Sequence, residues 1–228
     1  LNAIGPVWNG NEVWLLAAGG MMVVAFPRLY AAAFSGFYLA LIVVLWLLVL
    51  RGVAIEFRGQ VRHAMWSAFW DAVFGMASLL LALLLGVALG NVLRGLPLDA
   101  SGYFLGSFSL MLNPYALLIG LLSLAVLAWH GCNLVRTKAE GALEERARSW
   151  SRALWWGALL LAVPATVATL WLRRGTLNNF LTHPAGFVFP LLAGLGFGLA
   201  RSRRDSRAFA GSSLVIAGLL FSAALTLY

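Results

Sequence analysis

Long apolar runs divided by short arginine-bearing gaps are the feature that most limits how this chain can fold. A helix needs roughly 20 apolar residues to cross a bilayer, and seven stretches qualify, at residues 9–27, 29–50, 70–93, 113–136, 152–172, 184–200 and 207–228. Lipid offers no partners to open backbone groups, and no stretch alternates with a period of two, so helices are predicted rather than barrel strands. We therefore predict an all-α integral membrane protein, a polytopic transmembrane bundle of about seven helices.

The composition also indicates lipid as the solvent. Of the 228 residues, 62% are hydrophobic and 11% are charged, whereas a soluble domain is about half apolar and about a quarter charged. A net charge of +8 would suggest nucleic acid in a soluble protein. Here the arginines cluster between apolar runs, so no nucleic-acid binding is expected. The single cysteine, Cys132, excludes an intrachain disulfide and a Cys-rich metal site.

The basic residues predict which side each loop faces. One set of alternate gaps holds most of them: Arg51, Arg58, Arg62, Arg136, Lys138, Arg146, Arg148, Arg152, Arg201, Arg203, Arg204 and Arg207. The opposite gaps hold only Arg28, Arg94, Arg173 and Arg174. Cytoplasmic loops carry the excess of Lys and Arg, so the first set is predicted to face the cytoplasm. We expect one transmembrane domain, residues 1–228, and a natural chain that continues in both directions.

Two of these gaps are long enough to hold structure of their own. Residues 137–151 include Glu140, Glu144, Arg146 and Arg148, which predict a solvated helical extension. Residues 95–111 contain Pro97, Asp99, Gly102 and Gly106, which predict a loop with partial order.

Two acidic residues in or beside apolar segments are candidate proton carriers. Glu12 follows Asn9 by three residues, so the two share one helical face, and an acid inside a membrane suggests function because its burial in lipid is costly. Alternatively, Glu12 lies at the interface and caps or solvates the helix start. Asp71, flanked by Trp66 and Trp70, could transfer protons or be an N-terminal acid favoured by the helix dipole.

The histidines do not suggest a metal centre. His130 and Asn133 lie near the end of the fourth segment, where a histidine can ligate haem or hydrogen-bond to a neighbouring helix. His63 and His183 are predicted in loops on opposite sides, and no nucleophile triad or nucleotide-binding loop is present. No catalytic residue, cofactor ligand or metal ligand is therefore assigned to this chain.

Several ordered motifs resemble subunit II of the cytochrome bd-type quinol oxidases. They are GPVWNGNEVWL (5–15), FPRLYAAAFSGFYLAL (26–41), RGVAIEFR (51–58), WDAVFG (70–75), GVALGN (86–91), LNPYALLIGLL (112–122) and HGCNLVRTKAEGALEERAR (130–148). The resemblance covers about the first two-thirds of the chain, and beyond Ser149 only the hydropathy fits. Full-length members have about nine helices, so with roughly 20 residues per span this chain would hold the second to the eighth.

The resemblance implies partners, cofactors and a location. Subunit II pairs with the homologous, haem-bearing subunit I, sometimes with a small single-helix subunit, in the bacterial inner membrane. The complex oxidises quinol and reduces dioxygen to water with protons from the cytoplasm. Haem b and haem d would then be held by subunit I, and a structural quinone or lipid could bind to this chain.

The resemblance also assigns expectations to single residues. The family has an acid directly after the Trp8 position, on a proposed proton path, but Asn9 occupies that position here and cannot carry a proton. We expect Glu12, one turn on, to take over the role. Trp14 matches a tryptophan near a proposed oxygen route, although a tryptophan there can equally be an interfacial anchor.

Two other functions fit a helical bundle with few buried polar groups. One is a transporter or channel, although no inverted repeat is visible and Pro164 is the clearest proline inside a helix. The other is a purely structural assembly subunit.

Overall fold

The structure is a computed structural model that describes residues 4–5, 8–100, 104–202 and 204–227. The side chains of residues 9 and 11 are not described. Helices account for nearly all of the described chain. They are α1 (Trp8–Ala25), α2 (Pro27–Gly36), α3 (Tyr38–Phe57), α4 (Ala64–Arg94), α5 (Phe108–Met111), α6 (Pro114–Lys138), α7 (Ala142–Leu172), α8 (Thr176–Thr182), the 3₁₀ helix η1 (Pro184–Phe187), α9 (Val188–Leu199) and α10 (Asp205–Leu227). The all-helical prediction is confirmed.

Five of the described helices, α3, α4, α6, α7 and α10, are long and apolar enough to cross a membrane. A sixth crossing is possible where α8 and the segment Pro184–Leu199 meet at a bend of 113°. Helix α1 is apolar as well but shorter in its described part. The chain is thus a multi-pass membrane protein, with five or six of the seven predicted crossings met by length and composition.

The second predicted span differs from the structure in its boundaries. Residues 29–50 are divided between α2 and α3, which are separated at Phe37, and the spanning helix runs from Tyr38 to Phe57. Arg51, which we predicted in a loop, therefore lies inside α3. The long aliphatic stem of an arginine can follow the helix surface while its guanidinium reaches a polar level. A single charge therefore did not end this helix.

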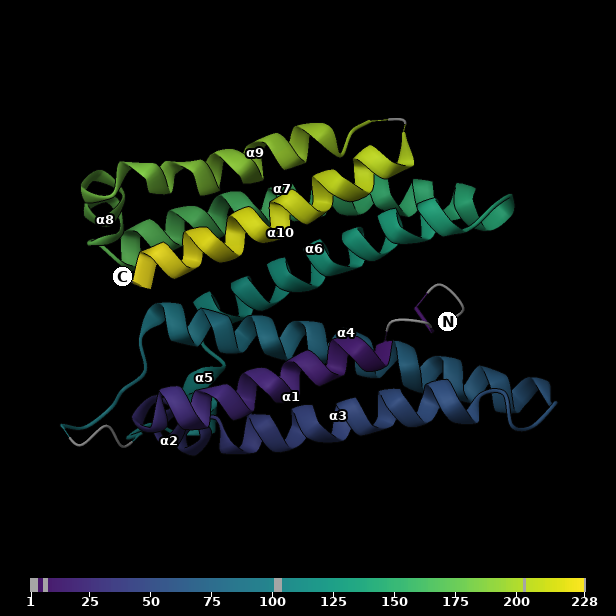
Figure 1. Ribbon diagram of the computed structural model, residues 1–228, viewed down its shortest axis with the longest axis horizontal. Coiled ribbons are helices and arrows are strands. Elements are labelled where there is room, and N and C mark those ends of the chain that lie inside the picture. Colours follow the sequence, from purple (N-terminus) through teal and green to yellow (C-terminus); the bar gives the residue numbers. More distant parts are fainter. Residues whose placement is uncertain (1–3, 6–7, 101–103, 203, 228) are drawn as a thin grey trace.

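The helices form two groups, α1 to α4 and α6 to α10, and α4 and α6 lie side by side between them (Figure 1). Small residues allow this close approach. A methyl group added at Gly86 would lie 2.8 Å from the Cα of Gly120, and one at Gly90 would lie 2.7 Å from the Cα of Ala116. Both distances are too short, so the crossing depends on glycine at these two positions.

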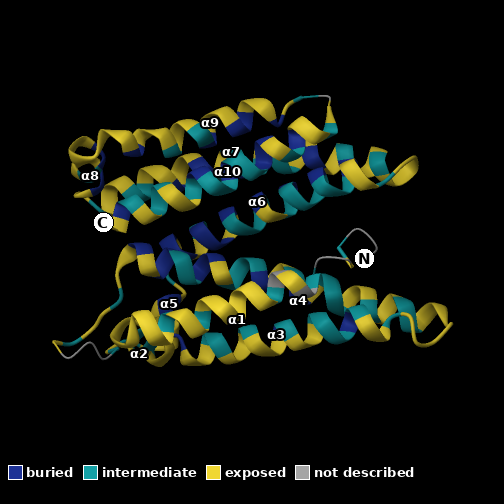
Figure 2. Cartoon of the chain, viewed as in Figure 1, coloured by how far each residue is buried: buried dark blue, intermediate teal, exposed yellow. Residues whose placement is uncertain are grey.

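The buried core lies mainly in the second group, where α6, α7, α9 and α10 meet. Trp129 is fully buried there and stacks on Phe197 with ring centroids 5.5 Å apart. In contrast, most of α1 is coloured as exposed (Figure 2). Trp14 is 77% exposed and Val24 is 84% exposed on that helix. Apolar side chains that face outward need lipid or another membrane chain as their surroundings.

Candidate functional site

Glu12 lies one turn inside α1, and part of its carboxyl group is buried. Its Oε1 atom is inaccessible to solvent and has no hydrogen-bond partner among the described residues. Trp8, one turn earlier, packs against α3, because a methyl group on Gly52 would meet its ring at 3.6 Å. Glu12 is therefore about 6 Å further along the helix axis than this contact. Glu12 as a whole is of intermediate exposure, so both the proton path and the interfacial position remain predictions.

The side chain of Asn9 lies outside what the structure describes, although its backbone belongs to α1. Trp14 extends outward from the same helix. These three candidate residues therefore share one helix, and Glu12 is the one with a buried polar atom in the described part of the chain.

Asp71 forms a two-point ion pair with Arg58 at the end of the helical hairpin α3–α4. Arg58 Nε donates to Oδ1 at 2.6 Å and Nη2 donates to Oδ2 at 3.0 Å. Both side chains are partly exposed, at 42% and 49%. The bond and the negative charge of Asp71 raise the pKa of Arg58. Asp71 lies two turns inside α4, so the helix-dipole alternative does not describe its position.

Arg51 is a residue whose position the sequence did not reveal. Its guanidinium carbon lies 5.6 Å from the centre of the Phe74 ring on α4, a cation–π distance. Its Nε atom is buried without a partner among the described residues, as are Trp70 Nε1 and Ser78 Oγ. Together with Glu12, these residues give α1, α3 and α4 four buried polar atoms that the described chain does not satisfy. Buried polar groups are normally hydrogen-bonded, and these four atoms depart from that rule within the described part of the chain.

A second polar cluster joins α6, α7 and α10 at the end that carries the basic gaps. Arg136 is buried and donates to Asp205 through Nε at 2.9 Å, while its Nη2 lies 2.6 Å from the same carboxylate oxygen. Arg136 Nη1 reaches Asn133 Oδ1 at 3.1 Å, and Ser151 donates to that same amide oxygen at 2.7 Å. The cluster fixes the relative positions of three helices.

Arg148 extends this cluster towards the surface. Its Nη2 atom lies 2.7 Å from Glu144 and 3.1 Å from Asp205. We had predicted Glu144 and Arg148 on a solvated extension of the helix. The helix does begin at Ala142, but these two side chains are only about a third exposed. Asp205, an acid at the start of the last apolar run, indicated a polar contact there, but the sequence did not identify its partners.

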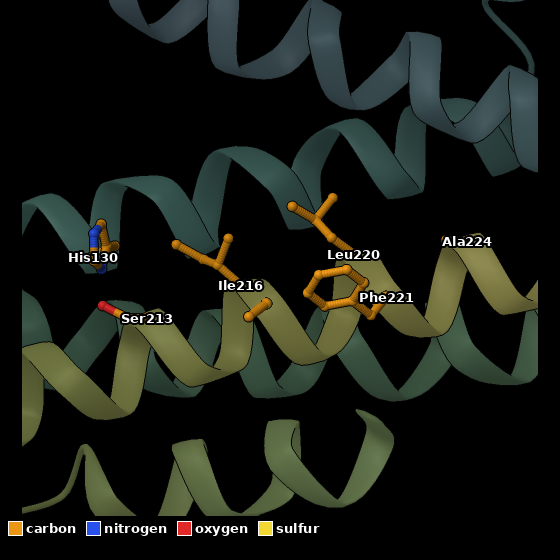
Figure 3. Close-up of a pocket in the computed structure, with 7 residues that line it drawn as sticks. His130, Ser213, Ile216, Leu220, Phe221 and Ala224 are labelled. Carbon is orange, nitrogen blue, oxygen red and sulfur yellow. The ribbon is translucent and has the colours of Figure 1, made fainter. Parts of the chain in front are cut away.

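His130 forms a helix–helix hydrogen bond, one of the two roles considered from the sequence. Its Nδ1 lies 2.9 Å from Ser212 Oγ on α10, and its ring stacks on Phe209 at 4.8 Å. Next to it, a groove of about 530 Å³ runs along α10. Figure 3 shows His130 and Ser213 at one end of this groove and Phe221 and Ala224 towards the other. The groove is therefore apolar apart from one end.

The described residues bring no group of three or more His, Cys, Asp or Glu side chains together to hold a metal ion. His63 and His183 lie at helix boundaries rather than inside the five long apolar helices. Cys132 is a free thiol on α6.

Comparison with known proteins gives a consistent result over the whole chain. A family model described as cytochrome bd terminal oxidase subunit II matches residues 1–228. The probable cytochrome oxidase subunit 2 of Haemophilus influenzae is 33% identical, and the match covers 100% of this chain and 69% of that protein.

Two further relatives are similar to the same extent. The cytochrome bd-I ubiquinol oxidase subunit 2 of Escherichia coli is 31% identical, over 100% of this chain and 69% of its own length. The cytochrome bd ubiquinol oxidase subunit 2 of Bacillus subtilis is 34% identical, over 97% of this chain and 67% of its own length.

Proposed function

The chain belongs to the cytochrome bd terminal oxidase subunit II family, and from this membership we propose how it contributes to the oxidase. As subunit II it is part of a respiratory oxidoreductase complex and assembles with subunit I. We propose that the partner subunit holds haem b and haem d, that quinol is oxidised there, and that this chain stabilises the partner and delivers protons to it. The match over the full chain carries the assignment.

The assembly is tested by what co-purifies with this chain in mild detergent. A reduced-minus-oxidised visible spectrum with haem b and haem d bands, together with a second large subunit, is the expected result. A haem-free chain from cells that express both subunits would count against it and would favour the transporter alternative.

Within this complex we propose that Glu12 carries protons. Its buried Oε1 has no partner among the described residues, so the hydrogen-bonding capacity of this oxygen is unused within them. A carboxyl group there can take up a proton from the side of the basic loops and release it further along α1. Asp71 is less suited to this task, because both of its oxygens accept hydrogen bonds from Arg58. A proton carried through Asp71 would require one of those bonds to open.

Glu12→Gln tests this role, because it keeps the shape of the side chain and removes the titratable group. We expect quinol-driven oxygen consumption and proton uptake by the intact complex to fall at least about a hundredfold, the lower end of the range for proton-transfer effects. The matched control is Glu56→Gln on the exposed surface of α3, with no expected loss. Haem content measures assembly in both. Unchanged turnover and proton uptake in Glu12→Gln would refute the role and favour a purely structural subunit.

We propose that the basic gaps face the cytoplasm of the bacterial inner membrane. Support comes from the excess of arginine on that side. A cysteine placed at Glu140, in a Cys132→Ser background, should react with a membrane-impermeant maleimide in inverted vesicles and not in intact spheroplasts. The reverse pattern would invert the orientation.

A further inference from the structure

We propose that the pocket between α6, α7 and the turn after α9 binds the phosphate headgroup of an anionic phospholipid. The pocket has a volume of about 500 Å³. Four arginines line it, namely Arg136, Arg148, Arg152 and Arg201. Trp129 and Trp155 are two of the three tryptophans in the lining. This inference goes beyond the role in the oxidase, because neither proton delivery nor assembly with subunit I requires it.

The pocket carries positive charge that its own acids do not balance. Arg136 and Arg148 share Asp205, and Arg148 also pairs with Glu144. Arg152 and Arg201 are exposed and form no ion pair with the described residues. Four guanidinium groups against two carboxylates leave a net charge of +2 at the pocket. Arginine is well suited to phosphate, because its planar fork donates two parallel hydrogen bonds.

Two features prepare the pocket for an acceptor oxygen. The guanidinium carbon of Arg201 lies 5.1 Å from the centre of the Trp155 ring, so this arginine is held in place rather than free in solution. Trp129, which lines the pocket, is fully buried, and its indole Nε1–H has no partner among the described residues. A buried donor is rarely left without an acceptor in a native protein. A phosphate oxygen would satisfy it after a small shift of the lining side chains, because this nitrogen is closed to a water-sized group in the structure.

The surroundings of the pocket favour a lipid over a soluble anion. The pocket lies where α7 passes from charged residues to its apolar run, the level at which headgroups and tryptophans are found. Trp156 belongs to the lining and is 54% exposed. Leu160, 68% exposed, and Val163, 59% exposed, continue the same helix face into the apolar region. Acyl chains could follow this face, whereas inorganic phosphate would gain nothing from it.

The test uses the intact oxidase complex, partly delipidated in detergent and titrated with phosphatidylglycerol under native mass spectrometry. Arg152→Gln with Arg201→Gln should weaken phosphatidylglycerol binding about 25-fold, because each arginine that lines the pocket and contacts the anionic headgroup contributes roughly fivefold. The matched control removes two exposed arginines outside the pocket lining, Arg204→Gln with Arg207→Gln, and should leave this binding unchanged. Phosphatidylcholine should bind weakly to all three proteins.

A second variant tests the buried donor. Trp129→Phe keeps an aromatic ring on Phe197 and removes the indole N–H, so binding should weaken severalfold while the haem spectrum of the complex stays the same. Equal binding by the pocket double variant and its control would overturn the proposal. It would also be overturned if inorganic phosphate displaced phosphatidylglycerol at equal concentration, because the site would then recognise a soluble anion.

Discussion

The ion pair between Arg136 and Asp205 offers a sharp test of what holds the second group of helices together. The Arg136 side chain is 5% exposed and that of Asp205 is 26% exposed. Asp205→Asn keeps the size of the side chain but leaves the buried guanidinium without its counter-ion. Asn133 and Ser151 still contact Arg136, yet neither carries a charge.

The expected cost follows from this burial. Removing one partner of a fully buried pair costs about 3–5 kcal/mol, because the other charge stays in a poorly solvated place. Asp205 is only three-quarters buried, and water can approach the position it leaves. We therefore expect the free energy of unfolding to fall by about 2–3 kcal/mol, below the fully buried range.

Equilibrium unfolding of the purified complex in mixed micelles, titrated with dodecyl sulfate and followed by circular dichroism, measures this change. Asp71→Asn is the matched control, because it removes the same type of group from an ion pair whose side chains are 42% and 49% exposed. Exposed pairs contribute little, so the unfolding midpoint of the control should not move.

A double replacement separates the charge effect from packing. Arg136→Met with Asp205→Leu removes both charges and fills similar volumes, so it should be less destabilising than Asp205→Asn alone. Equal shifts for Asp205→Asn and Asp71→Asn would refute the reasoning. So would a double variant whose loss equals the sum of the losses from Arg136→Met and Asp205→Leu measured separately.

Two further changes test the helix crossing and the outer face of α1. Gly90→Ala should cost about 1–3 kcal/mol through overpacking against Ala116, whereas Gly75→Ala on the same helix meets nothing within 4 Å and should be neutral or stabilising in the same unfolding assay. Trp14→Ala should raise the oxygen KM of the complex with quinol turnover at saturating oxygen unchanged, if this exposed ring lines an oxygen route. An unchanged KM would leave Trp14 as an interfacial anchor.

Hydropathy predicted the fold class because a helix that crosses lipid must be apolar over about 20 residues, and hydropathy measures this directly. The helices around residues 70–93 and 113–136 were located within a few residues, except that α4 begins earlier, at Ala64. The boundaries of the second span were wrong because a run of apolar residues is compatible with a membrane helix along its whole length. Such a run does not determine the residue at which the helix begins. The separation of α2 from α3 at Phe37 lies inside such a run.

The polar contacts were harder to predict, because they join residues far apart in sequence. Glu12 could be singled out, since an acid among apolar residues is unusual at any depth. Arg148 could not be paired with Asp205 from the sequence, because 57 positions separate them and only the packing of both α7 and α10 on α6 brings them together. An arginine in a basic gap looks the same in the sequence whether it is solvated or buried.

The lengths of α4 and α7 have a consequence for the membrane itself. Each has 31 residues, or about 46 Å at 1.5 Å per residue, whereas the hydrocarbon core is about 30 Å thick. A helix of this length tilts or extends beyond the lipid. In α7 the surplus lies at its charged beginning, which is in effect a stretch of soluble protein above the bilayer. A thicker or thinner membrane would then change how much of that stretch is covered without placing the central apolar turns in water.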